Sequence, residues 1–265
     1  MTFDTYIINL DKDKQKFNKL SSSLSSKNIN HKRFSAIYGK DMGNTYDKYI
    51  VKHKSFVPKN ILGCSLSHYF VCKQHFDNSD NPAFILEDDA VLLFKNKNDI
   101  DNVIINAPPD WDIILLYAQG MTNYKKNTWD TTFFTFSSIG YIINRNGYNK
   151  WYPTNFKIRG HNDLTRLIKK FDGTGLKMYK TPIMMIKPDD TNISSTSTNY
   201  KHMIKNIDDI LDNYFYDALE TDVTNFKASQ ILKYKILRVP YIDFDIDSLM
   251  IVCILILFYI ILKYA

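Results

Sequence analysis

Three consecutive carboxylates, Glu87, Asp88 and Asp89, lie between two strongly apolar runs. The preceding residues, 83–86, indicate a buried strand that ends where the acids begin. Three negative charges at one strand terminus repel one another unless a cation joins them. Mg²⁺ or Mn²⁺, bound by carboxylate oxygens together with a phosphate-bearing substrate, would meet that requirement. The alternative is a solvated acidic turn between a strand and a loop.

A second group with ligand chemistry lies about 20 residues earlier. Apolar residues between Leu62 and Phe76 follow one stripe of a predicted helix, and Cys64, His68 and His75 fall on the opposite face. This set invites a zinc interpretation, but it supplies three ligands at most, and His75 lies two turns from His68. We therefore favour a solvated or cleft-facing polar side for this helix.

The elements that must position these residues follow from the periodicity of the sequence. The predicted strands cover residues 5–10, 31–37, 84–86, 111–117, 133–136 and 140–144, with one or two more within 176–186. The predicted helices cover residues 11–24, 62–76, 147–152 and 163–171. This alternation indicates an α/β fold with a mainly parallel sheet.

The later part of the chain is organised differently. Residues 190–200 form a Ser/Thr/Asn-rich linker, and helical patterning then resumes and continues to about residue 237. We expect a catalytic domain at 1–195, a helical extension and juxtamembrane linker at 196–247, and a transmembrane helix at 248–264.

The apolar run from Leu249 to Leu262 contains no charged residue. Extended to 248–264, with Lys263 reaching toward the headgroups, it approaches the lower length limit for a membrane span. A buried carboxyl-terminal helix is the alternative. The first ten residues do not resemble a signal peptide, so we expect a single-pass tail anchor that leaves the catalytic domain in the cytosol.

The overall composition excludes several classes of protein. The net charge of +6 is modest, and the basic residues are scattered, so nucleic-acid binding has no support. Three cysteines cannot build a disulfide framework, which suits a reducing compartment.

Four motifs together resemble glycosyltransferase family 25, which includes lipooligosaccharide and procollagen galactosyltransferases. They are Tyr6–Asp11 (YIINLD), Phe34–Gly39 (FSAIYG), Gly63–His68 (GCSLSH) and Ala83–Asp89 (AFILEDD). The resemblance covers roughly residues 3–195, and its specific part is the pairing of the last two motifs. This chain departs from the family pattern at Ile61, where an acid is common, and around Lys14 and Lys16, where the family has arginines.

The resemblance implies a GT-A-like, Rossmann-type sheet with flanking helices that binds a nucleotide sugar and a divalent cation, Mn²⁺ or Mg²⁺. In this sequence Glu87 and Asp89 would hold the metal. The residues implied at the nucleotide sugar are Asn9, Asp11, Ala36, Gly39, Ser67, His68 and Asp88. Asp163 would be the base of an inverting reaction, and its alternative role is a charge that favours the start of a helix.

These observations favour a metal-dependent hexosyltransferase that moves galactose or glucose from a nucleotide-diphosphate sugar, such as a UDP-hexose, to a glycan or glycoprotein acceptor. The first alternative is a catalytically degenerate, membrane-anchored binding or scaffold protein. The second is a metal-dependent phosphohydrolase, for which only His161 and Asp163 could supply further ligands.

Overall fold

The structure is a computed structural model that describes residues 2–50, 59–117, 119–120, 128–131, 135–158, 161–171, 173–189, 235–239 and 244–247. The chain divides into two compact units, Met1–Ser195 and Thr196–Ala265.

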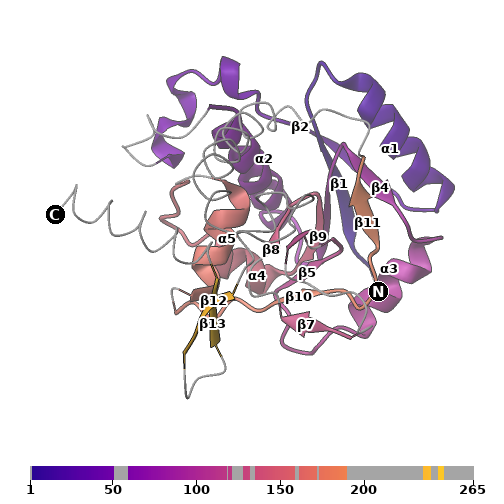
Figure 1. Ribbon diagram of the computed structural model, residues 1–265. Coiled ribbons are helices and arrows are strands. Elements are labelled where there is room, and N and C mark those ends of the chain that lie inside the picture. Colours follow the sequence, from indigo (N-terminus) through magenta and orange to yellow (C-terminus); the bar gives the residue numbers. More distant parts are fainter. Residues whose placement is uncertain are drawn as a thin grey trace, which may run out of the picture. The chain divides into compact units, whose positions relative to one another are not determined.

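Seven strands form the main sheet of the first unit, in the order β2-β1-β3-β9-β5-β10-β7 (Figure 1). In that order their bounds are Lys32–Ser35, Asp4–Asn9, Ala83–Glu87, Gly140–Ile143, Ile113–Leu115, Met178–Lys180 and Asp130–Thr131.

Five of these strands run in one direction, because β2, β1 and β3 pair in parallel and β9 is antiparallel to both β3 and β5. Strand β10 is parallel to β5, and β7 is antiparallel to β10. The structure therefore confirms the prediction of an α/β fold with a mainly parallel sheet. The expectation did not include β9 as an antiparallel strand in the middle of the sheet.

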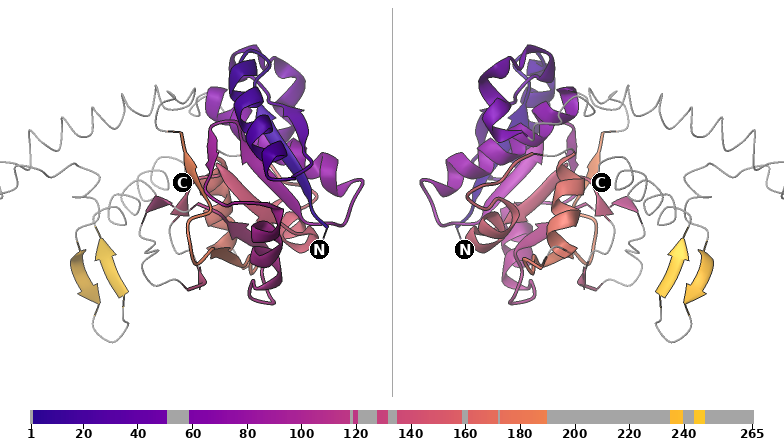
Figure 2. Two further views of the ribbon diagram at one scale, coloured as in Figure 1. Left: turned by 90° about the vertical axis from the view of Figure 1, so that its right-hand side faces the viewer. Right: turned by 90° about the vertical axis from the view of Figure 1, so that its left-hand side faces the viewer.

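Helices cover both faces of the sheet. Figure 1 shows α1 (Lys14–Ser26) and α3 (Lys97–Ile105) on one side. On the other side lie α2 (Lys59–Phe76), α4 (Arg145–Trp151) and α5 (Asn162–Phe171). The two views of Figure 2 look at the sheet from the α1 side and from the opposite side.

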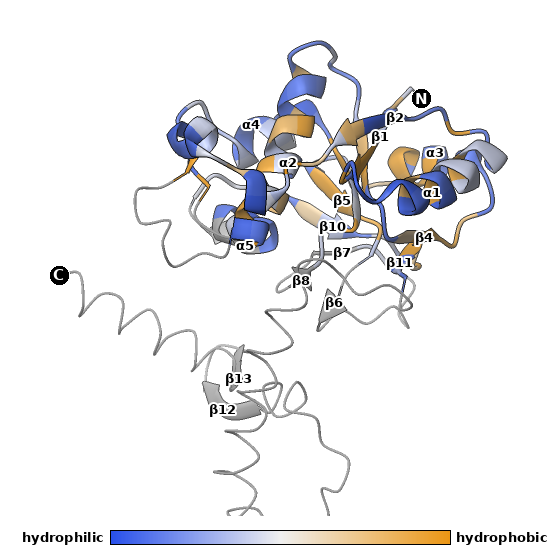
Figure 3. Ribbon diagram, turned by 90° about the horizontal axis from the view of Figure 1, so that it is seen from above, coloured by the Kyte–Doolittle hydropathy of each residue, from blue (hydrophilic) through white to orange (hydrophobic). Residues whose placement is uncertain are grey.

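Alternation along the strands produces two separate hydrophobic layers. Ile7, Phe84 and Leu86 point toward α1 and α3, whereas Ile8 and Ile85 point toward α2 and α4. Figure 3 shows the strands in the middle of the sheet in orange and α1 mostly in blue, as expected for a helix that buries only one stripe.

Short elements complete the first unit. They are the 3₁₀ helices Gly39–Asp41 and Asn44–Tyr49, the pair β4 (Ala90–Leu92) with β11 (Ile186–Pro188), and the pair β6 (Gln119–Gly120) with β8 (Thr135–Phe136). The strand that continues the chain after the acids, β4, was not predicted, and neither was α3.

In the second unit the structure describes an antiparallel pair, β12 (Lys235–Val239) and β13 (Phe244–Asp247). The prediction that helical patterning continues to about residue 237 is wrong from residue 235 onward. Leu237 lies opposite Ile246 and Val239 opposite Phe244, and these cross-strand pairs override the weaker helical period.

The described residues include no helix with the length and hydrophobicity needed to cross a membrane. The apolar segment at 248–264 and the linker at 190–200 lie outside those residues, so the expected membrane helix stays a prediction.

Candidate active site

The carboxyl ends of β1, β2 and β3 meet at one edge of the sheet, because the three strands are parallel neighbours. Ile8 pairs with Glu87 in the register of β1 and β3, which places Asn9 beside Asp88. The backbone N–H of Ala36, just after β2, donates to the carbonyl of Asn9 at 2.9 Å. The edge at which a doubly wound sheet binds its ligand therefore carries the acids of β3.

Asn9 connects all three strand ends. Its Nδ2 donates to Asp88 Oδ2 at 2.6 Å and to the carbonyl of Asp13 at 3.0 Å. Its Oδ1 accepts from Arg33 Nε at 2.9 Å. Asn9 is buried, so these bonds fix the orientation of Asp88 without help from solvent.

Asp11 and Arg33 continue the network toward solvent. Arg33 donates to Asp11 Oδ1 at 2.6 Å, and Ser35 Oγ donates to the same atom at 2.8 Å. These two bonds lower the pKa of Asp11. The carboxylate is therefore ionised and exposed at the mouth of β1.

In contrast to Asp11, the pKa values of Asp88 and Asp89 are raised. Burial is the main cause that raises the pKa of Asp88, although the bond from Asn9 lowers it. Burial, followed by the negative charges of Glu87 and Asp88, raises the pKa of Asp89 to about 7. The positive charge of Lys16 on α1 lowers the pKa of both acids, but it does not compensate for the burial.

The Asp89 carboxylate fits a divalent cation. Its Oδ1 is buried and has no hydrogen-bond partner among the described residues. A buried carboxylate oxygen without a partner is costly unless a cation or a proton satisfies it. Glu87, two residues earlier at the end of β3, is partly exposed and offers a second carboxylate of the oxygen type that Mg²⁺ and Mn²⁺ prefer. The predicted acidic corner is therefore compatible with the metal interpretation.

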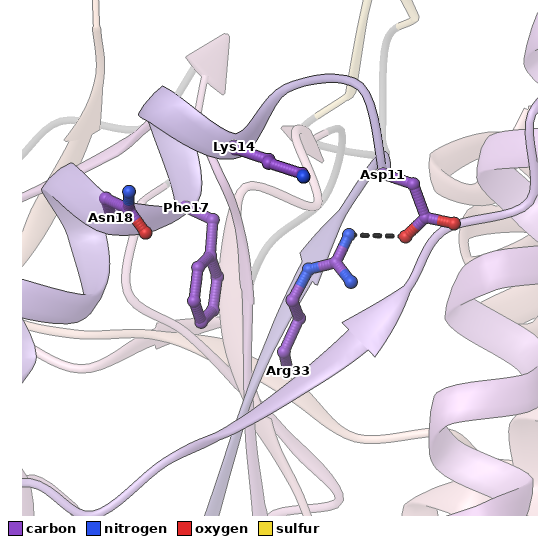
Figure 4. Close-up of a pocket in the computed structure, with 5 residues that line it drawn as sticks. All are labelled: Asp11, Lys14, Phe17, Asn18 and Arg33. Atoms are coloured by element: carbon purple, nitrogen blue, oxygen red, sulfur yellow. Dashed lines mark hydrogen bonds and ion pairs between the residues drawn. The ribbon is translucent and has the colours of Figure 1, made fainter.

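A cavity of about 360 Å³ opens next to this corner. It is lined by Asp11 after β1, by Lys14, Phe17 and Asn18 of α1, and by Arg33 of β2 (Figure 4). The Arg33 guanidinium lies 5.7 Å from the centre of the Phe17 ring. The cavity thus combines an aromatic ring, two cations and a carboxylate.

His68 reaches the acids from the other layer. Its Nε2 lies 3.2 Å from Glu87 Oε1, and its Nδ1 lies 3.0 Å from the hydroxyl of Tyr141 on β9. Cys64 lies one turn earlier on α2, and its ligand atom and those of His68 and Glu87 all lie within 4.8 Å of one another. Burial, and then the negative charge of Glu87, raises the pKa of the Cys64 thiol.

The polar face predicted for α2 needs one correction. His68 contacts Glu87, but neither His68 nor His75 is solvated, because each is only 1% exposed. His75 lies apart from Cys64, since its Nδ1 contacts the Tyr6 hydroxyl and its Nε2 contacts the carbonyl of Asn81. The helix is buried on several sides because it lies between the sheet and the segments around it.

Gly39 and Ser67 hold the backbone near the site. Ser67 is buried, its Oγ donates to the carbonyl of Gly63 at 2.7 Å, and it accepts from the N–H of Ile37 at 2.8 Å. A Cβ on Gly39 would lie 2.0 Å from the carbonyl oxygen of Lys59, and one on Gly63 would lie 2.5 Å from that of Ile37. The segment 36–39 therefore packs directly on the first turns of α2, which explains these motif glycines.

Asp163, the predicted base, is almost fully buried at the start of α5. It accepts from the N–H of Ser137 at 2.8 Å and from the Ser138 hydroxyl, and it lies 3.4 Å from Arg166 NH2. Ser137 has a φ of +133°, a backbone conformation that is strained for a residue with a side chain. Asp163 therefore stabilises the strained segment that leads to Ile139, whose carbonyl accepts from the N–H of Glu87.

Several residues at this edge were not among the predicted set, notably Arg33, Ser35 and Phe17. Arg33 and Ser35 are two apart on β2 and share a face, so the period of the strand could have indicated them. The helical spacing of Phe17, Leu20 and Leu24 predicts an apolar stripe on this helix, but the position of Phe17 beside Arg33 follows only from the tertiary structure.

A family model described as "Glycosyltransferase family 25 (LPS biosynthesis protein)" matches residues 3–167. This range contains Asn9, the acids of β3 and Asp163. No curated protein matches the chain.

Proposed function

The chain belongs to glycosyltransferase family 25, and from this we propose that it moves a hexose, galactose or glucose, from a nucleotide-diphosphate sugar to a glycan or protein-linked acceptor with the help of Mn²⁺ or Mg²⁺. Within the α/β class we propose a GT-A-like arrangement. The observation that carries the metal dependence is the buried Oδ1 of Asp89, which lacks a partner among the described residues.

In this proposal Glu87 and Asp89 hold the cation. The bound cation would supply positive charge to the diphosphate as it leaves. Asn9 keeps Asp88 in place through its bond of 2.6 Å, and Lys16 adds a further positive charge near Asp88 and Asp89. Asp89 therefore has a carboxylate oxygen without a hydrogen-bond partner among the described residues, whereas the neighbouring Asp88 is held by Asn9.

The cavity beside β1 and β2 suits the nucleoside part of the donor. Phe17 offers a ring for stacking, and Lys14 offers a cation for the diphosphate. Arg33 and Ser35 both donate to Asp11 Oδ1, which leaves Oδ2 for a ribose hydroxyl. Uridine diphosphate is the nucleotide we expect, in line with the galactosyltransferases that the sequence resembles.

For the transfer step we propose inversion at the anomeric carbon. The acceptor hydroxyl attacks that carbon, the bond to the diphosphate breaks, and a carboxylate takes the proton of the hydroxyl. Asp163 is our candidate for that base. A carboxylate has about four lone-pair sites, so the bonds from Ser137 and Ser138 leave it capacity to accept a proton.

We also propose that residues 248–264 attach the enzyme to a membrane, which would bring it to lipid-linked or membrane-bound acceptors. The support is the uncharged run from Leu249 to Leu262. Deleting residues 248–265 should release the protein from washed membranes into the soluble fraction. If the full-length chain is already recovered in the soluble fraction, the anchor proposal is wrong.

The central test is donor hydrolysis by the purified full-length chain across a panel of nucleotide sugars, with and without Mn²⁺. We expect hydrolysis of a UDP-hexose that depends on the metal and is lost in Asp89→Ala. The matched control is Asp80→Ala, which removes an acid that is 88% exposed and pairs with Arg145. Equal rates for the wild type and Asp89→Ala would overturn the metal assignment.

A further inference from the structure

Three different ligand types converge between α2 and the end of β3. The Sγ of Cys64, a ring nitrogen of His68 and a carboxylate oxygen of Glu87 lie within 4.8 Å of one another. Cys64 and His68 are four residues apart on α2, so their side chains lie on the same face of the helix. Such an i, i+4 pair plus one residue from a neighbouring strand is a compact way to present three ligands to one ion.

The chemistry of this set differs from that of the oxygen ligands proposed for Mg²⁺ or Mn²⁺. Thiolate and imidazole favour borderline and soft ions such as Zn²⁺ and Co²⁺, whereas Mg²⁺ prefers carboxylate, carbonyl and water oxygens. Three protein ligands leave a tetrahedral ion one open position for water or another small ligand. Cys64 and Glu87 are both partly exposed, so an ion can reach them from solvent.

His68 is already oriented for such a role. The buried hydroxyl of Tyr141 lies 3.0 Å from Nδ1, and Nε2 points to Glu87 at 3.2 Å. A hydrogen bond from Nδ1–H to the tyrosine oxygen leaves a lone pair on Nε2, which is the form that binds a metal. Ligating histidines commonly have a partner of this kind on the second nitrogen.

The surrounding charges also favour a cation at this place. The negative charges of Glu87, Asp163 and Asp89 all act on Cys64. Among the described residues no lysine or arginine forms an ion pair with Glu87, whose Oε1 lies 3.2 Å from His68 Nε2. A divalent ion between the three ligands would neutralise this group of acids.

We propose that Cys64, His68 and Glu87 form a site for a thiol-seeking transition metal of the Zn²⁺ type. It is distinct from the site expected for Mg²⁺ or Mn²⁺ but shares Glu87 with it. From the sequence, zinc at Cys64, His68 and His75 was set aside in favour of a polar helix face, but in the fold Glu87 takes the place of His75 beside the other two residues. On binding, the Cys64 thiol loses its proton to solvent and its sulfur becomes a metal ligand.

Shared use of Glu87 has a consequence that rests on the proposed function. An ion held by Cys64 and His68 would take up the Glu87 carboxylate, which already lies 3.2 Å from His68, and so withdraw it from the Mn²⁺ site. Zn²⁺ and Mn²⁺ should therefore compete, and Zn²⁺ should inhibit transfer in a manner relieved by excess Mn²⁺.

The direct test uses Co²⁺ with the metal-free full-length chain and reads absorption, independently of any donor. We expect one equivalent to produce a near-ultraviolet thiolate-to-cobalt charge-transfer band that Zn²⁺ abolishes by displacement. Cys64→Ser should lose the band, and Cys253→Ser, the matched cysteine control, should keep it. Tyr141→Phe should weaken Co²⁺ binding by about 10- to 100-fold, since it removes the partner of Nδ1.

A second measurement needs no variant. Zn²⁺ should slow the alkylation of Cys64 by iodoacetamide in the wild type, as mapped by mass spectrometry, and Mg²⁺ should not. The proposal is overturned if Co²⁺ gives no thiolate band, if the band persists in Cys64→Ser, or if Zn²⁺ leaves the alkylation rate unchanged. Asp89→Asn should lose Mn²⁺-dependent donor hydrolysis but keep the thiolate band, which separates failure of this site from failure of the proposed function.

Discussion

The side chain of Asn9 lies 2.6 Å from the carboxylate of Asp88, so the last residue of β1 holds the acid that follows β3. The same amide accepts from Arg33 of β2 through its oxygen. One buried side chain therefore ties together the ends of three parallel strands, and the acidic corner depends on it for its shape.

Removal of this amide should loosen the corner. We expect Asn9→Ala to lower the free energy of unfolding by about 1–3 kcal/mol, because the change leaves buried polar groups without partners. Urea denaturation measures the loss. Asn102→Ala, on the exposed side of α3, serves as the control and should stay within about 0.5 kcal/mol of the wild type. Equal effects of the two substitutions would contradict the linking role of Asn9.

The raised pKa of Asp89 predicts a pH dependence for the metal-free protein. The carboxyl titrates near 3.8 when unfolded and at about 7 when folded, so the folded state binds the additional proton between these values. Stability falls with rising pH wherever the folded state binds more protons. The free energy of unfolding should therefore decrease from about pH 4 to pH 7 in the presence of a chelator.

Urea denaturation across this pH range tests the assignment. Asp89→Asn should flatten the decrease, and Mn²⁺ should restore stability to the wild type near pH 7 but not to the variant. Asp80→Asn, which changes an exposed acid, should retain the slope of the wild type. An Asp89→Asn slope identical to that of the wild type would show that another group is responsible.

The cavity predicts a specific requirement for arginine at position 33. Arg33 uses Nε for Asn9 and NH2 for Asp11, and a lysine cannot reproduce this fork. We expect Arg33→Lys to weaken the binding of uridine diphosphate with Mn²⁺ about tenfold, which corresponds to about 1.4 kcal/mol. Isothermal titration calorimetry measures the change. Lys32→Ala, the exposed neighbour on β2, should bind like the wild type, and unchanged affinity in Arg33→Lys would exclude this cavity as the nucleotide site.

Asp163 should prove important for stability as well as for transfer. Asp163→Asn leaves the buried guanidinium of Arg166 without its carboxylate and should cost about 3 kcal/mol. Asp77→Asn removes an exposed carboxylate that pairs with Lys73 and should cost less than about 1 kcal/mol. Urea denaturation compares the two.

The same variant tests the proposed base. At a temperature where Asp163→Asn remains folded, it should still bind uridine diphosphate with Mn²⁺ but should no longer transfer the sugar. Transfer at the rate of the wild type would leave Asp163 with a structural role only, as the residue that holds Ser137 and Ser138.

The amino-acid sequence by itself determined the local features of this protein, namely individual strands, helix faces and the acids at a strand end. The apolar run 83–86 predicts a strand, and the acids at 87–89 follow where it ends, because both features depend on a few adjacent residues. The stripe through Leu20 and Leu24 likewise predicts the buried face of α1. The carboxyl ends of neighbouring parallel strands lie at one edge of the sheet. The sequence could therefore also predict that Asn9 lies near the acids of β3.

Only the tertiary structure decided which distant side chains meet. The strand β9 enters antiparallel between β3 and β5, and its Tyr141 orients His68. Helical spacing placed Cys64, His68 and His75 on one face of the helix, but the packing of α2 against β3 brings Glu87 to Cys64 and His68 instead of His75. Strand order and helix packing arise from the burial of the whole core, and no window of local sequence contains that information.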